Sequence, residues 1–231
     1  MRKVFAVLAW LAVAAAGIFL AVQLSFLARV WWWRDHNPSD TAFMQARMEQ
    51  LRAKDPKAKL QHLWVAYDRI APSLKRAVVV AEDAKFSDHE GFDWEAIEKA
   101  REKNRQKGRI VAGGSTISQQ LAKNLFLSGE RSALRKGQEA LITVMIEQVM
   151  SKRRILEIYL NMIEWGDGVF GAEAAARHYY GISAAALGAE QSARLAAIVP
   201  NPRFYDRNRN TGYLARRTQT ILARMPAAEL P

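Results

Sequence analysis

The most extended feature of the hydrophobic pattern is an apolar run at the N-terminus, from Val4 to Ala28. Gln23 is its only strongly polar side chain, and basic residues flank it, Arg2 and Lys3 before it and Arg29 after it. A helix of this length reaches about 37 Å, enough to cross a bilayer core of roughly 30 Å with some tilt. Cleaved signal peptides have shorter apolar regions. We therefore predict an uncleaved membrane anchor, with a cleaved signal or a buried core helix as the alternatives.

Three consecutive tryptophans, Trp31 to Trp33, follow the anchor between two arginines. Tryptophan is enriched at membrane–water interfaces, so this cluster predicts an interfacial belt, although three core tryptophans at a domain edge would read similarly. The basic N-terminus indicates that the short tail stays inside and the globular part lies outside the cytoplasm. The expected organisation is a tail at 1–3, an anchor at 4–28, a membrane-associated juxtamembrane segment at 29–59 and a globular domain at 60–231.

The remaining apolar positions follow helical spacing, and no run of alternating strand residues occurs. Asp93 is the expected N-cap of one helix, and Thr116 with Gln119 forms a capping-box pattern at the start of another. The basic, glycine-bearing stretch 103–114 is predicted to be a mobile loop. The pattern predicts an all-α domain with helices at 41–54, 72–82, 94–105, 116–127, 131–162 with a break near Ser151, 171–180, 184–199 and 213–225.

Composition narrows the classes of function. The 231 residues suffice for one domain and an anchor, and 34 basic against 23 acidic residues leave a formal charge of +11. Such a charge favours an anionic partner, such as nucleic acid, acidic lipid or phosphate. The chain has no cysteine, which excludes disulfide scaffolds, thiol nucleophiles and cysteine-ligated metal sites.

The first candidate for chemistry is the acidic segment 82–91, in which Glu82 and Asp83 follow an apolar run. This order places a carboxylate at the edge of the core, where it can act as a base. An acidic helix end with His89 on the surface is the competing interpretation. A metal site made of these three residues matches no common zinc spacing.

Two further segments are suited to an anion. Glycines 113 and 114 precede a helix N-terminus, where backbone N–H groups attract anions, and Lys123 lies about two turns into that helix; a flexible loop with a good cap is the simpler alternative. Arg131, Arg135 and Glu139 share one helix face. A solvated salt-bridged face is the usual explanation of such spacing, but paired guanidinium groups also suit a diphosphate leaving group. In segment 152–161, the apolar stripe that includes Tyr159 indicates core packing.

Taken in order, these segments resemble the five motifs of the peptidoglycan glycosyltransferases. The motifs read Glu-Asp-x-x-Phe-x-x-His-x-Gly at 82–91, Gly-Gly-Ser-Thr-x-x-Gln-Gln-x-x-Lys-Asn at 113–124, Arg-Lys-x-x-Glu at 135–139, Lys-x-x-Ile-Leu-Glu-x-Tyr-Leu-Asn at 152–161, and Gly-x-x-x-Ala with Tyr-Tyr-Gly at 171–181. The resemblance covers residues 60–205, and the tripeptide 164–166 is similar to the monofunctional biosynthetic branch. Ser118 and Tyr180 depart from the threonine and phenylalanine that are usual there.

The resemblance implies a lysozyme-like helical domain that polymerises lipid II without transpeptidase activity. In that family the glycan leaves an undecaprenyl-diphosphate donor, with inversion, for the 4-hydroxyl of lipid II. The implied location is the bacterial inner membrane, with the catalytic domain on the periplasmic side of a single span. Lipid II, the lipid-linked glycan and the bilayer are the implied partners, together with other cell-wall synthesis proteins.

The same resemblance implies roles for individual residues. Glu82 is the general base, which cationic neighbours should keep ionised. Glu139 is the second catalytic carboxylate, and whether it orients a basic partner, contacts substrate or helps hold a divalent ion such as Mg²⁺ or Mn²⁺ stays open; no cofactor is required. Cations replace a general acid at the leaving diphosphate. The implied substrate-binding residues are Asp83, Phe86, His89, Ser115, Thr116, Gln119, Gln120, Lys123, Asn124, Arg131, Arg135 and Lys136.

Two rival functions remain at this stage. A lytic, lysozyme-like enzyme would need an acid whose pKa an apolar pocket raises, and the basic cluster near Glu82 argues against it. A non-catalytic envelope scaffold would tolerate Glu82→Gln. Nucleic acid is not an expected partner, because the domain is exported and no recognition motif occurs.

Overall fold

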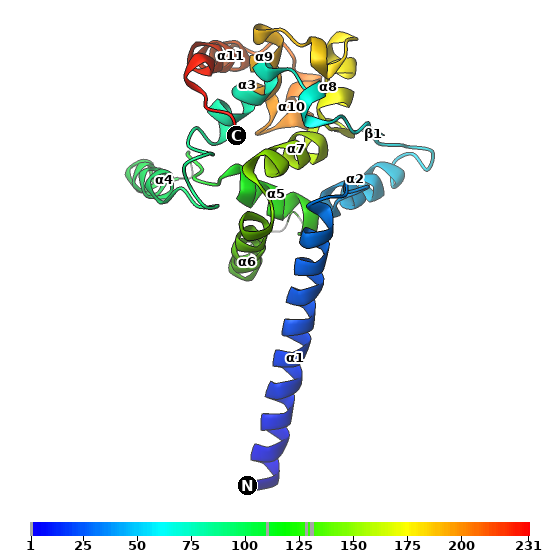
Figure 1. Ribbon diagram of the computed structural model, residues 1–231, viewed down its shortest axis with the longest axis vertical. Coiled ribbons are helices and arrows are strands. Elements are labelled where there is room, and N and C mark those ends of the chain that lie inside the picture. The colour runs from blue at the N-terminus through cyan, green and yellow to red at the C-terminus, as the bar shows by residue number, and fades with distance from the viewer. Residues whose placement is uncertain (1, 110, 128, 130–131) are drawn as a thin grey trace.

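The computed structural model describes residues 2–109, 111–127, 129 and 132–231, and it shows one long helix standing out from a helical body (Figure 1). The long helix is α1, Arg2–Trp33. The other α-helices are α2 Ala42–Arg52, α3 Pro72–Glu82, α4 Trp94–Lys107, α5 Ile117–Phe126, α6 Ala133–Val149, α7 Lys152–Met162, α8 Ala172–Tyr180, α9 Ala189–Ile198, α10 Pro202–Arg207 and α11 Gly212–Arg224. Short 3₁₀ turns lie at Tyr67–Arg69, Ala184–Ala186 and Met225–Ala227.

Side-chain caps account for most of the predicted helix starts. Asp93 accepts a hydrogen bond from the backbone N–H of Ala96, and Thr116 forms the complete capping box with Gln119. The predicted break near Ser151 is confirmed, because Met150 is extended and Ser151 caps α7.

Three expectations about helix extent need correction. The predicted loop at 103–114 is helical as far as Lys107, where Gly108 ends α4 in the left-handed conformation. The predicted helix 184–199 is a 3₁₀ turn followed by α9, and α10 was not predicted. A helix of six residues is too short to show hydrophobic spacing. Pro202 in the first turn of α10 is the local sequence feature that indicates where this helix begins.

The predicted helical fold class is confirmed, and a small sheet accompanies the helices. The strands are β1 Gln61–His62, β2 Glu164–Gly166 and β3 Val169–Phe170, in the order β1-β3-β2. β1 pairs parallel to β3, with Gln61 opposite Val169, and β2 pairs antiparallel to β3. Strands of two or three residues are too short to show alternation, so the sequence pattern could not reveal them.

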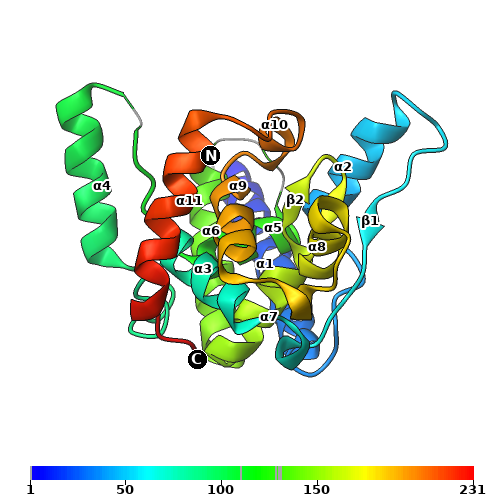
Figure 2. The ribbon, with the colours of Figure 1, turned by 90° about the horizontal axis from the view of Figure 1, so that it is seen from above.

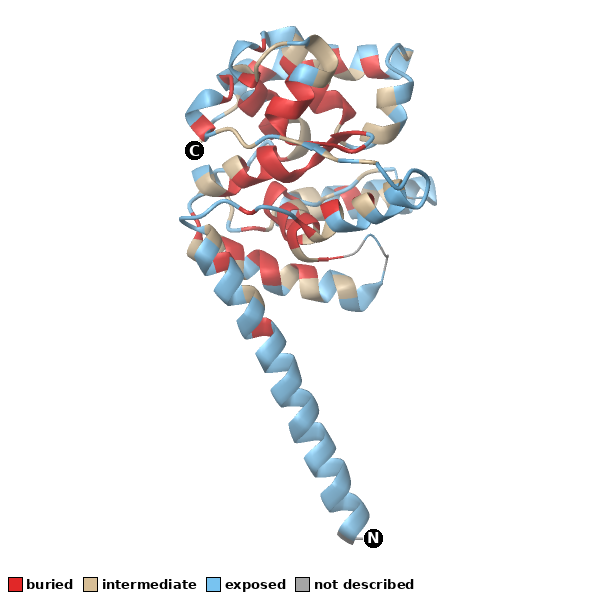
Figure 3. Ribbon diagram, turned by 90° about the vertical axis from the view of Figure 1, so that its right-hand side faces the viewer, coloured by how far each residue is buried: buried red, intermediate tan, exposed pale blue. Residues whose placement is uncertain are grey.

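The core lies where α3, α5, α7 and α9 pack together beneath the upper surface of the body (Figures 2 and 3). Its largest fully buried side chains include Trp165, Tyr159, Phe86 and Phe170. Burying a side chain of this size contributes about 2 kcal/mol or more. Seen from above, α4 stands at one edge of the body, and α2 with β1 stands at the opposite edge (Figure 2).

The first part of α1 is exposed, whereas its last turns dock on the body. Its apolar stretch is the one helix in the described residues that is long and apolar enough to span a membrane. Gln23 and Gln138 of α6 exchange two hydrogen bonds of 2.9 Å, and Phe26 and Trp33 pack against Phe126 at the end of α5.

The helix continues beyond the predicted anchor end at residue 28 and includes all three tryptophans. Trp31 is 56% exposed and Trp32 is 53% exposed, as an interfacial belt requires, while Trp33 packs on the body.

Candidate active site

Glu82 ends α3, whose preceding valines Val78 and Val79 are fully buried. The Glu82 side chain is therefore held at the core's edge, and it is 10% exposed. Gln120 of α5 donates from Nε2 to Oε2 at 3.0 Å, and Arg217 of α11 donates from Nη2 to Oε1 at 3.4 Å. Each carboxylate oxygen thus has a different donor, and the two donors come from different helices.

Burial raises the pKa of Glu82, and it outweighs the opposing effects of the Gln120 hydrogen bond and of Arg217 and Lys123. The expected cationic neighbours, Arg217 and Lys123, do favour the ionised form, but burial has the larger effect. The physical reason is that the carboxylate loses more hydration than one neutral donor and two nearby cations restore. A carboxylate whose pKa is raised toward neutrality is the stronger proton acceptor.

Asp83 and His89 hold the loop between α3 and α4 and tie it to the start of α5. The Asp83 carboxylate accepts from the backbone N–H of Ile117 and from His89 Nε2, both at 2.9 Å, and His89 Nδ1 accepts from the backbone N–H of Gly91 at 3.2 Å. Both His89 nitrogens are therefore engaged. Phe86 has no exposed surface. Asp83 and Phe86 are buried, and the hydrogen bonds of Asp83 and His89 fix the loop that follows Glu82.

Gly91 is required by the backbone at this point. Its φ is +88°, and a Cβ atom there would lie 2.9 Å from Cγ2 of Thr143. Its carbonyl oxygen accepts a 2.7 Å hydrogen bond from the Thr116 hydroxyl, which joins the loop to the start of α5.

The predicted site residues in and just before α5 differ in exposure: some are buried with hydrogen-bond partners in the protein, and Ser115 is exposed. Thr116 and Gln119 are buried and occupied in the capping box, and Asn124 donates to the backbone carbonyl of Gln120. Ser115 is exposed at the helix start, where its hydroxyl lies 3.4 Å from Lys136 Nζ.

Glu139 lies at the centre of the basic cluster. Its side chain is 4% exposed and pairs with Arg135 Nη1 at 2.8 Å and with Lys136 Nζ. Burial lowers the pKa of Lys123, and the negative charges of Glu139 and Glu82 oppose that effect. The predicted residue Arg131 lies outside the described residues.

The divalent cation considered for Glu139 stays a prediction. Within the described part of the chain, no three His, Asp or Glu side chains converge as metal ligands. The carboxylate of Glu139 is occupied by two cations, and the ring of His89 by its two hydrogen bonds.

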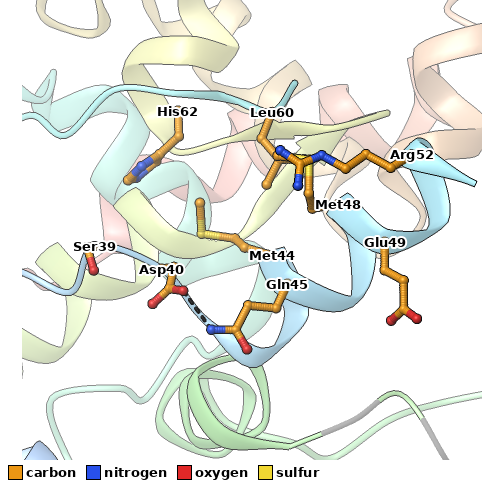
Figure 4. Close-up of a pocket in the computed structure, with 9 residues that line it drawn as sticks. All are labelled: Ser39, Asp40, Met44, Gln45, Met48, Glu49, Arg52, Leu60 and His62. Carbon is orange, nitrogen blue, oxygen red and sulfur yellow. Dashed lines mark hydrogen bonds between the residues drawn. The ribbon is translucent and has the colours of Figure 1, made fainter. Parts of the chain in front are cut away.

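Glu82 lines one hollow, and its hydrogen-bond partner Gln120 lines another. One, of about 280 Å³, is lined by Glu82, Asp83, Lys85 and residues 113–116. The other, of about 190 Å³, is lined by Gln120, Lys123, Tyr159, Glu164 and Arg203, among others. A larger hollow of about 680 Å³ lies between α2 and the strand region, on Met44, Met48, Leu60 and His62 (Figure 4), and contains none of the predicted site residues.

Two residues of the site, and the polar contact of a third, were missed from the sequence. Arg217 contacts Glu82 from outside every motif, and Arg203 lies 3.4 Å from Glu164 in the second hollow. Tyr159 is buried in the core, as predicted, and its hydroxyl also reaches Gln120. Of these three residues, Tyr159 lies inside a motif segment, and that position was the one sequence feature that could have indicated a role in the site.

Comparison with known proteins agrees with this geometry. The sequence profile described as Transglycosylase matches residues 47–226. The chain belongs to the transglycosylase family. It is 59% identical over 231 residues to the biosynthetic peptidoglycan transglycosylase of Janthinobacterium sp. (strain Marseille), covering 100% of both chains. It is 63% identical over 215 residues to the protein of the same name from Dechloromonas aromatica (strain RCB), covering 93% of each.

The transglycosylase match extends the resemblance noted for residues 60–205 in both directions. It begins within α2 and ends just beyond α11, so Arg217 lies inside the family region. The transglycosylase domain therefore includes every element that contributes a donor to Glu82.

Proposed function

We propose that this chain is a peptidoglycan glycosyltransferase that polymerises lipid II into linear glycan strands, without transpeptidase activity. The observation that carries the proposal is Glu82, which lines one hollow, bonds to Gln120 on the lining of a second, and has the cations Arg217 and Lys123 nearby. A polyprenyl-diphosphate donor and a hydroxyl acceptor need a base and a set of cations in this arrangement.

In the proposed reaction Glu82 accepts the proton of the acceptor 4-hydroxyl. The acceptor oxygen then forms a bond to the anomeric carbon of the donor, on the face opposite the leaving group, so the configuration inverts. The bond between that carbon and the diphosphate oxygen breaks, and the undecaprenyl diphosphate leaves as an anion. The proton on Glu82 passes to solvent before the next cycle.

The leaving diphosphate needs positive charge in place of an acid. Lys123, Arg135 and Lys136 supply this charge, and Glu139 holds the latter two in position through its ion pairs. We assign Glu139 this positioning role, and we propose that the transfer requires no cofactor.

We further propose that α1 anchors the protein in the bacterial inner membrane with the body on the periplasmic side. The exposed stretch of α1 before Gln23 begins at Val4 and measures about 28 Å, close to the roughly 30 Å of a bilayer core. Arg2 and Lys3 then remain in the cytoplasm. This arrangement brings the body to the surface from which lipid-tailed substrates project.

The experiment that tests the function separates synthesis from cleavage. Purified full chain in detergent is incubated with labelled lipid II, and in parallel with preformed labelled glycan. The raised pKa of Glu82 is also what a lytic acid would have, so this comparison is needed. Polymer that muramidase digests, with no shortening of preformed glycan, supports synthesis; shortening of the glycan without polymer would overturn it.

A further inference from the structure

Tyr159 lies in α7 with no exposed surface, and its hydroxyl points at the site rather than into apolar packing. The hydroxyl donates to Oε1 of Gln120 at 2.9 Å, and Nε2 of the same amide donates to Oε2 of Glu82 at 3.0 Å. Three side chains from α7, α5 and α3 therefore form one continuous hydrogen-bond chain that ends on the catalytic carboxylate.

The donors and acceptors along this hydrogen-bond chain can be assigned in only one way. An ionised carboxylate accepts hydrogen bonds and does not donate them, so the Gln120 amide must present its NH₂ group to Glu82. Its carbonyl oxygen then faces Tyr159, which must donate. Burial, together with the charges of Glu82 and Asp83, raises the pKa of Tyr159, so the hydroxyl keeps its proton.

Without that donor, the Glu82 carboxylate would be the one group in the described surroundings that distinguishes the two ends of the Gln120 amide. Its side chain has hydrogen-bond partners only in Glu82 and Tyr159 among the described residues. A flipped amide would place a carbonyl oxygen against the carboxylate, which is repulsive and leaves Oε2 of Glu82 without its donor.

We propose that Tyr159 is a positioning residue for the transfer reaction: its hydroxyl orients the Gln120 amide so that the amide N–H holds the Glu82 carboxylate in place. The proposal rests on the proposed function of Glu82 as the base. It gives the tyrosine of the fourth motif segment a role beyond the core packing that its apolar neighbours indicate.

The test is Tyr159→Phe, which removes the hydroxyl and keeps the ring. The charged groups facing Glu82 are Asp83, Lys123 and Arg217, and this change leaves all three in place. Losing the Gln120 hydrogen bond should raise the pKa of Glu82, because that bond favours the ionised form. In the full-length protein we expect kcat to fall about 5- to 20-fold with KM little changed, and the acidic limb of the pH–activity profile to move to higher pH.

A matched control is Tyr179→Phe, which deletes a partly buried hydroxyl that donates to the backbone oxygen of Trp165 at 2.8 Å and has no hydrogen bond to Glu82 or Gln120 among the described residues. Its pH profile should match that of the wild type even if its melting temperature falls. Adding Gln120→Ala to Tyr159→Phe should cause little further loss of kcat. Both substitutions interrupt the same series of hydrogen bonds to Glu82, so their effects should not add.

A titration without substrate separates this proposal from the proposed function. In protein carrying carboxyl-labelled glutamate, the Glu82 signal is assigned by its absence in Glu82→Gln, and its pKa is compared between wild type and Tyr159→Phe. A higher pKa in the variant supports the positioning role even if no polymer forms. An unchanged pKa, or losses of kcat that add fully to those of Gln120→Ala, would overturn it.

Discussion

At Glu82, opposing effects act on one carboxylate. Burial favours the protonated form, while Gln120, Arg217 and Lys123 favour the ionised form. The balance leaves the pKa raised, which makes Glu82 a better proton acceptor as long as the working pH stays above that pKa. Activity should therefore be lost as the pH falls through the raised pKa of Glu82.

Replacing Arg217 by Gln should change the pH below which activity is lost. Removing the cation raises the pKa of Glu82 further, so the acidic limb of the profile should move to higher pH. The measurement is kcat/KM for lipid II polymerisation against pH. The matched control is Arg216→Gln, an exposed neighbour on α11. A shift toward lower pH in Arg217→Gln would contradict this account of the site.

Between elements, Asp83 connects the end of α3 to the start of α5. Its carboxylate accepts from the first backbone N–H of α5 and from His89, and negative charge at a helix N-terminus is favourable. Asp83→Asn should lower the free energy of unfolding by about 1–3 kcal/mol. Thermal or denaturant unfolding measures the loss, and Asp88→Asn, an exposed acid of the same segment, is the control. Equal stability of the two variants would contradict the role assigned to Asp83.

The contact between α1 and α6 depends on one reciprocal amide pair. Gln23→Leu or Gln138→Leu alone leaves a buried amide without its partner, at a cost of about 1 kcal/mol. The double variant should recover part of that loss, since no polar group is left unpaired. Melting temperatures of the full chain in detergent complete the double-mutant cycle. Fully additive losses would show that the two residues do not interact.

These elements also show what the sequence could and could not predict. Helix caps such as Asp93 and Thr116 act over three or four residues, so their spacing is visible in the chain. The contact between Gln23 and Gln138 spans 115 residues, and that between Arg217 and Glu82 spans 135. Such pairs depend on the packing of whole helices and leave no local pattern. The family resemblance located the motif segments, but it could not show which of their residues, such as Phe86, are buried.

At the scale of the whole molecule, α6 is the helix of the body that lies nearest the exposed part of α1 (Figure 1). Its outer face carries Leu134, 88% exposed, with Leu141 and Val144 at 44% and 48%. With α1 in a bilayer, this face lies at the membrane surface and buries apolar area there.

Introducing charge on this face should therefore impair activity only in a bilayer. We expect the double variant Leu134→Glu with Val144→Glu to polymerise lipid II about three- to tenfold more slowly than wild type in vesicles, and equally fast in detergent. Tyr213→Glu changes a similarly exposed apolar side chain on α11, on the far side of the body (Figure 1). An equal loss in detergent, or an equal loss for Tyr213→Glu, would contradict the assignment of this face to the membrane.

The most direct test of the central claim is lipid II polymerisation by the wild type, Glu82→Gln and Glu90→Gln. Glu90 is an exposed acid in the same segment, which makes it the matched control. Glu82→Gln removes a buried charge, so it should fold at least as stably as the wild type at neutral pH. The account predicts a loss of at least about 100-fold for Glu82→Gln and none for Glu90→Gln. Polymer formed at the wild-type rate by folded Glu82→Gln would contradict it.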